Sequence, residues 1–208
     1  MGDGLSFGPL TRNSIHLCLD MQRLFSREGP WPTPWMERVL PVAAEIAAQH
    51  PRQTVFTRFR SPWTAETATG QWQSLYRKWP QVTQRECDPA LFELMDPLRE
   101  LAPPATMFDK STYSAFATGE LKTMLDRRRA DALIITGSET DVCVVATVMQ
   151  AIDIGYRVIV VTNAICSSSD EGHDRLLAHF RERLGQQIET ARSDEVLAAA
   201  WSGRTRPS

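Results

Sequence analysis

The stretch that decides the fold is ALIITGSETDVCVVATVMQAIDIGYRVIVV, residues 132–161. It opens with a short apolar run at 132–136 and closes with another at 158–161, and both runs predict buried strands. Between them, Thr140 is placed to cap a helix that runs to about Ile154, and Gly155 closes that helix. A strand, a helix and a strand in this order predict two parallel strands of one sheet.

The same alternation of apolar runs and amphipathic segments extends along the whole 208-residue chain. Further strands are expected at 15–20, 54–57, 106–108 and 187–189, and further helices at 35–50, 118–129, from 170 and at 193–201. Loop and short helix are expected at 61–80, and Asp88 with Pro89 opens another helix. Because the strands are apolar throughout, both faces of the sheet should be covered. We therefore predict one α/β domain, residues 1–208, with three layers (α/β/α) and a six-stranded, mostly parallel, Rossmann-like sheet.

Composition narrows the range of partners and locations. A formal net charge of −2 argues against nucleic acid or an anionic membrane as the main partner, since both require clustered positive charge. No stretch is apolar enough over a sufficient length to span a bilayer, and the N-terminus lacks the features of a secretion signal. The four cysteines, Cys18, Cys87, Cys143 and Cys166, form no CxxC pair, so reduced thiols are expected. These observations predict a cytoplasmic protein.

Three reactive side chains follow three different predicted strands. Asp20 ends the first strand, Lys110 follows the third, and Cys143 falls in the first turn of the helix after the fourth. Ligands of an open parallel sheet bind beyond the carboxyl ends of its strands, so an acid, an amine and a thiol should meet there. A helix N-terminus should also lower the pKa of the Cys143 thiol. The alternative is that Cys143 is a small buried residue among valines.

Three blocks of sequence resemble the signature blocks of the isochorismatase-like cysteine hydrolases. These blocks are LDMQ at 19–22, DKSTYSAF at 109–116 and GSETDVCV at 137–144. Three later segments of the chain also resemble segments of this family. They are Asn163-Ala164, the serines at 167–169, and Glu195-Val196-Leu197. The likeness covers about residues 14–201, and the order and spacing of the three blocks make it specific.

The resemblance implies a catalytic triad of Asp20, Lys110 and Cys143. It also implies a cis peptide bond between Ser138 and Glu139, with the backbone amides of Glu139 and Cys143 as oxyanion donors. The implied reaction cleaves a C–N bond of a small amide, ureido or carbamoyl compound through a thioester acyl-enzyme. A homodimer or homotetramer is expected from the same resemblance and from the tryptophan-rich loops.

No metal and no cofactor are predicted. Nicotinamidases of this family carry a metal site built on an Asp-x-His pattern after the second strand, and residues 57–63 have no such pattern. His173 is a possible Cys–His partner of Cys143, although a place on the surface is the simpler interpretation. Cys166 is the rival thiol, but no acid or lysine follows it in register.

Aromatic and basic residues near the triad are candidates for the substrate pocket. The predicted substrate-binding residues are Phe25, Arg58, Trp63, Tyr113 and Phe116. Trp31 and Trp35 are further candidates, with packing between loops or subunits as the alternative. Arg58 and Arg60 are candidates as well, with one of the two expected to face the pocket. Such an arginine would bind a substrate carboxylate, and surface solvation is the alternative.

Two other functions remain open at this point. An isochorismatase-type hydrolase cleaves an enol ether, which needs an acid but no thiol, so Cys143 argues against it. A binding protein with an idle triad is the second, and the presence of all three triad residues argues against it. A nucleotide-binding function is excluded because the first strand is not followed by a glycine-rich phosphate loop. The residues that follow it are Met21-Gln22-Arg23.

Overall fold

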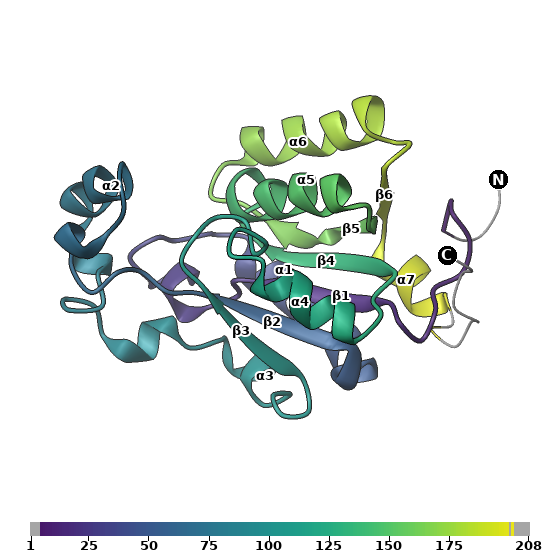
Figure 1. The fold of residues 1–208 in the computed structure, drawn as a ribbon, viewed down its shortest axis with the longest axis horizontal. Coiled ribbons are helices and arrows are strands. Elements are labelled where there is room, and N and C mark those ends of the chain that lie inside the picture. The colour runs from purple at the N-terminus through teal and green to yellow at the C-terminus, as the bar shows by residue number, and fades with distance from the viewer. Residues whose placement is uncertain (1–4, 200, 202–208) are drawn as a thin grey trace.

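A single six-stranded sheet forms the centre of the molecule. The computed structural model describes residues 5–199 and 201. Its strands are β1 (Ile15–Leu19), β2 (Thr54–Phe59), β3 (Thr106–Lys110), β4 (Ala132–Ser138), β5 (Arg157–Cys166) and β6 (Ile188–Ala191). They lie in the order β3-β2-β1-β4-β5-β6, and every neighbouring pair is parallel. The chain crosses from one half of the sheet to the other between β3 and β4, beside β1 (Figure 1).

Helices cover both faces of this sheet, which confirms the predicted three layers. The longer helices are α1 (Met36–Gln49), α4 (Glu120–Arg127), α5 (Val145–Ile154) and α6 (Asp170–Arg183), and α7 (Ser193–Ala198) is shorter. On β4, Leu133 shares a core with Val148 of α5, whereas Ile134 shares one with Ile46 of α1. Neighbouring residues of a strand therefore pack against different helix layers, and all these side chains are buried.

Several predicted boundaries shift. β2 and β5 are longer than expected and end at Phe59 and Cys166. Asp88 caps a helix as predicted, since its side chain accepts a hydrogen bond from the Ala90 amide at 2.8 Å, but only a short 3₁₀ helix follows. Thr140 is not the cap that the sequence predicts: Glu139 holds that position, and residues 140–144 form a π-helical turn before α5.

The connection between β2 and β3 carries the most irregular structure. It holds α2 (Trp72–Lys78), α3 (Asp96–Arg99) and several 3₁₀ turns. In Figure 1, α2 lies away from the sheet at one side of the molecule, opposite the side where α7 lies. This connection supplies one wall of the pocket described below. Within the described residues, no helix has both the length and the hydropathy that crossing a bilayer requires.

His16, on the central strand β1, makes stability depend on pH. Its ring is fully buried and lies 3.2 Å from Thr54 Oγ1 and 2.8 Å from Thr136 Oγ1. Burial, with a smaller contribution from the charge of His50, lowers the pKa of His16 to about 3. The unfolded chain binds this proton near pH 6.5, so His16 costs no stability above that pH and destabilises the fold as the pH falls toward 3.

We expect this effect to be measurable between pH 7 and pH 4. The shift predicts a loss of about 3 kcal/mol in the free energy of unfolding from His16 alone. Urea unfolding at both pH values should therefore show a smaller loss for His16→Gln than for the wild type, because glutamine does not titrate. Equal losses in the two proteins would contradict the assignment.

Candidate active site

The three predicted triad residues meet at the carboxyl edge of the sheet. Asp20 directly follows β1, Lys110 ends β3, and Cys143 lies in the turn after β4. Lys110 Nζ lies 2.6 Å from Asp20 Oδ2 and 3.5 Å from Cys143 Sγ, and it also donates to the carbonyl oxygen of Thr112 at 2.9 Å. Asp20 is fully buried, and Lys110 and Cys143 are each 6% exposed. The acid, the amine and the thiol therefore form one contiguous buried group.

Burial and mutual charge set the protonation of this group. Burial alone would lower the pKa of Lys110, but the negative charge of Asp20 raises it, and the net shift is upward. For Cys143, burial raises the pKa of the thiol, Asp20 raises it further, and Lys110 opposes both. The pKa lowering expected from the helix N-terminus is thus wrong in direction. The resting thiol is protonated and needs a base.

The sheet holds Asp20 in an unusual backbone conformation. Its φ is +49°, and its amide donates to the carbonyl oxygen of Thr57 at 3.3 Å. The Thr57 hydroxyl donates to Asp20 Oδ1 at 2.6 Å, so β2 orients the carboxylate from one side and Lys110 from the other. On the neighbouring strand, Gly137 has a φ of +110°, and a Cβ there would lie 2.0 Å from the Leu19 carbonyl oxygen. Only glycine allows this close approach.

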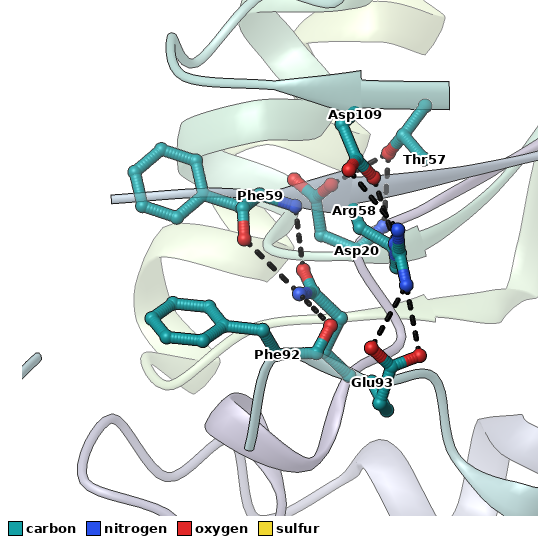
Figure 2. A network of polar contacts seen from close by, with 8 residues as sticks. Asp20, Thr57, Arg58, Phe59, Phe92, Glu93 and Asp109 are labelled. Atoms are coloured by element: carbon teal, nitrogen blue, oxygen red, sulfur yellow. Dashed lines mark hydrogen bonds and ion pairs between the residues drawn. The ribbon is translucent and has the colours of Figure 1, made fainter. Parts of the chain in front are cut away.

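Gln22 ties the loop after β1 to its surroundings. Its side-chain amide donates to the carbonyl oxygens of Phe59 at 3.0 Å and Phe92 at 2.7 Å, and its Oε1 accepts from the Phe59 amide at 2.6 Å (Figure 2). Gln22 is fully buried, so all three bonds are shielded from water. This residue therefore fixes the end of β2 next to the active site.

The turn after β4 carries Glu139 and Cys143, whose backbone amides are the expected oxyanion donors. The Ser138–Glu139 peptide bond is cis, as the resemblance implies. Glu139 and Cys143 line the same pocket, whereas Ser138 is buried behind it. The structure does not bring His173 to the pocket that contains Cys143: its Nδ1 lies 2.8 Å from Thr140 Oγ1 instead.

An aromatic pocket of about 320 Å³ opens onto Cys143. Its aromatic residues are Phe25, Trp31, Phe59, Trp72, Trp79 and Tyr113. Pro30, Pro32, Leu75 and Val142 add apolar surface, and Glu139 and Ser168 are its polar members besides the thiol. The pocket thus has one reactive group at its base and a wall made mostly of rings.

Some predicted pocket residues lie elsewhere. Arg58 points the other way, toward Asp109 at 2.7 Å and Glu93 at 2.8 Å (Figure 2). Trp63 is 60% exposed and does not line the pocket. Phe116 is buried in the core beneath α4 and α5, where it stacks on Tyr156. Arg58, Trp63 and Phe116 therefore lie outside the pocket, whereas Phe25 and Tyr113 line it.

The other candidates divide in the same way. Trp31 lines the pocket, but Trp35 lines a separate, smaller hollow that also contains Cys166. Arg60 lies over the ring of Phe92 and not in the pocket. Two tryptophans that the sequence did not single out, Trp72 and Trp79, complete the wall. In the sequence, only their position in the tryptophan-rich segment indicated a place in the pocket.

Metal ligands do not cluster in the described part of the chain. No group of three or more histidine, cysteine, aspartate or glutamate residues there is arranged to hold a metal ion. Cys166 lies in its own hollow with Asp170 and His173, and burial raises the pKa of its thiol to about 12. No lysine lines that hollow, so Cys166 lacks the arrangement that surrounds Cys143.

Comparison with known proteins shows a consistent likeness. The model of the isochorismatase domain matches residues 14–192. An uncharacterized isochorismatase family protein, PncA of Bacillus subtilis, is 36% identical over 89 residues, which cover 43% of this chain and 49% of that protein. The matched segments thus span less than half the length of the curated relatives.

Solved structures share the fold over nearly the whole chain. A cysteine hydrolase from Pseudomonas syringae pv. phaseolicola 1448A superposes with a TM-score of 0.75 and 24% identity, covering 96% of this chain and 98% of the other. N-carbamoylsarcosine amidase from Thermoplasma acidophilum superposes with a TM-score of 0.70 and 21% identity. That superposition covers 88% of this chain and 97% of the other. At these identities the likeness establishes the fold.

Proposed function

The chain belongs to the isochorismatase family, and from this premise we propose that it is a cysteine hydrolase that cleaves a C–N bond of a small amide, ureido or carbamoyl compound. The observation that carries the proposal is the contact of Lys110 with both the Asp20 carboxylate and the Cys143 sulfur, at the base of an open pocket. An acid, an amine and a thiol in this arrangement suit nucleophilic catalysis.

In the proposed reaction, Asp20 removes the proton from the Cys143 thiol as the sulfur attacks the substrate carbonyl carbon. Lys110 orients Asp20 and stabilises the negative charge, and the amides of Glu139 and Cys143 donate to the oxyanion. The proton then passes from Asp20 to the leaving nitrogen, the C–N bond breaks, and a thioester remains on Cys143. Asp20 next activates a water molecule, which releases the acid and restores the thiol.

The raised pKa of the Cys143 thiol supports Asp20 as the base that removes its proton. A preformed thiolate would need no acceptor, but burial and Asp20 hold the Cys143 thiol protonated near neutral pH. Asp20 is the carboxylate nearest to receive that proton, and Lys110 and Thr57 fix its two oxygens. These contacts support general base catalysis by Asp20.

Two alternatives receive less support. Enol-ether hydrolysis of the isochorismatase type needs an acid but no thiol, and here the thiol lies at the base of the pocket. An idle binding protein would have no need for a buried Asp20–Lys110 pair, because removing such charges from water is costly. The homodimer or homotetramer and the cytoplasmic location stay predictions.

The direct test is a screen for ammonia and acid released from a panel of small amides, ureido acids and carbamoyl compounds. We expect turnover of some members and unchanged rates after treatment with EDTA, because the proposed steps use only side chains and backbone amides. Loss of all activity on chelation, restored by added zinc or iron, would contradict the metal-independent mechanism.

A further inference from the structure

The wall of the pocket is a curved set of aromatic rings. The centroid of the Trp31 ring lies 6.2 Å from Phe25, 6.3 Å from Phe59 and 6.3 Å from Trp79, at interplanar angles of 21°, 50° and 76°. The Trp72 ring continues this wall, 4.7 Å from the ring of Tyr113. Rings at several angles present faces to a ligand from more than one side, and the face of each ring carries the negative part of its quadrupole.

The charge in the described pocket lining is negative. Among the described residues that line the pocket, Glu139 is the only charged one, and none is basic. Its Oε2 accepts a hydrogen bond from the Ser168 amide at 3.0 Å, but no described lysine, arginine or histidine forms an ion pair with it. Burial raises the pKa of Glu139, so the surroundings of this carboxylate disfavour its negative charge. A cationic ligand would offset that effect.

The nearby lysines do not supply an anion site. Lys110 is paired with the Asp20 carboxylate at 2.6 Å and does not line the pocket. Lys78 lies 5.9 Å from the Trp79 ring, but it is exposed to solvent, which screens its charge, and it does not line the pocket. A substrate carboxylate would therefore meet the carboxylate of Glu139 and the negative faces of the rings.

We propose that the substrate of this pocket carries a methylated ammonium group a short distance from the scissile amide, and carries no carboxylate. The ring faces attract such a cation through their quadrupoles, and Glu139 adds a counter-charge. Glu139 and Cys143 line the same pocket, so a short linker between the ammonium and the acyl carbon suffices. This inference rests on the proposed hydrolase function and specifies its substrate class.

Three amides of matched size test the charge preference in the wild-type enzyme. They are trimethylammonioacetamide, its neutral isostere 3,3-dimethylbutanamide, and the anionic succinamate. We expect kcat/KM for the cationic amide to exceed that for the neutral isostere by about tenfold or more, with succinamate the poorest. A neutral amide equal to the cationic one, or succinamate as the best substrate, would overturn the inference while leaving the hydrolase function intact.

The role of Glu139 is tested by Glu139→Gln. This change should lower the cationic-to-neutral ratio of kcat/KM by about tenfold, because it removes the counter-charge and keeps the shape. Glu28→Gln is the matched control, since it removes one exposed carboxylate from the loop that carries Phe25 and Pro30 but does not line the pocket. An unchanged ratio in Glu139→Gln, or an equal fall in both variants, would contradict the assignment.

A binding measurement separates this inference from the proposed reaction. Tetramethylammonium chloride should quench the tryptophan fluorescence of Cys143→Ala protein saturably, whereas sodium chloride and tert-butyl alcohol at equal concentration should not. Combining Cys143→Ala with Glu139→Gln should weaken that binding. If no amide is turned over but this binding is present, the cation site stands and the hydrolase proposal fails. If tetramethylammonium does not bind, the cation site is refuted even where amides are turned over.

Discussion

Replacing Cys143 with alanine should lower kcat on any amide substrate by about 10⁴-fold or more, since the nucleophile of the acyl transfer is lost. The thermal midpoint should stay close to that of the wild type, because alanine removes only a sulfur atom at the base of an open pocket. Cys143→Ser should be nearly as inactive, because Asp20 must then remove a proton from a much weaker acid. Steady-state kinetics and thermal unfolding measure both quantities.

Cys166→Ala is the matched control for this change. Cys166 is also buried, at 2% exposed, and it is the last residue of β5, but it lies in a separate hollow. Its replacement should leave kcat within about twofold of the wild type, at a modest cost in stability. Full activity in Cys143→Ala, or its loss in Cys166→Ala at an unchanged fold, would contradict the assignment of the nucleophile.

Asp20→Asn should have the second largest effect. Asparagine keeps the shape of the side chain but accepts no proton, so kcat should fall by about 10²- to 10⁴-fold. The change also leaves the buried Lys110 ammonium without its counter-charge, which should destabilise the fold by about 3–5 kcal/mol unless Lys110 loses its proton. Kinetics and urea unfolding of the same preparation separate the catalytic loss from the structural one.

Asp109→Asn provides the comparison for Asp20→Asn. Asp109 precedes Lys110 on β3, but its carboxylate pairs with Arg58 on the other face of the strand and is partly exposed. Its replacement should change kcat little and stability by less than about 1 kcal/mol. Comparable losses of activity in the two variants would show that the charge near Lys110 matters in general and that Asp20 has no special role as a base.

The fold and the meeting of Asp20, Lys110 and Cys143 could be predicted, because both depend on where the buried strands begin and end. Continuous apolar runs separated by helices predict buried parallel strands, and the carboxyl ends of such strands meet at one edge. Asp20, Lys110 and Cys143 each follow such a run, so their meeting needs no knowledge of the loops. The three sequence blocks that carry the family resemblance lie at these same strand ends.

The pocket wall could not be predicted in the same way, because it depends on how irregular segments pack. Trp72 and Trp79 reach the site through the connection between β2 and β3, whose path no periodicity defines. Arg58 was predicted to bind the substrate, but it forms an ion pair with Asp109. Asp109 is its register partner on β3. Thr57 was missed, although a polar residue in a buried apolar strand was a usable signal.

The pKa of Cys143 depends on tertiary contacts more than on the position of the residue in its helix. A thiol in the first turn of a helix is expected to be acidic, but here the first turn is buried and faces a carboxylate. Burial and the negative charge of Asp20 together outweigh the Lys110 ammonium and raise the pKa of the thiol. The sequence alone does not reveal this balance, which makes a general base necessary.

The thioester on Cys143 is the central claim, and mass spectrometry of acid-quenched enzyme tests it most directly. Enzyme mixed with excess substrate, quenched during turnover and digested should yield a peptide containing Cys143 that is heavier by the acyl group. Brief treatment with hydroxylamine before digestion should remove that mass, because thioesters are cleaved by this nucleophile. The mechanism predicts this adduct on Cys143 alone, and an acyl group found on Cys166 during turnover would contradict it.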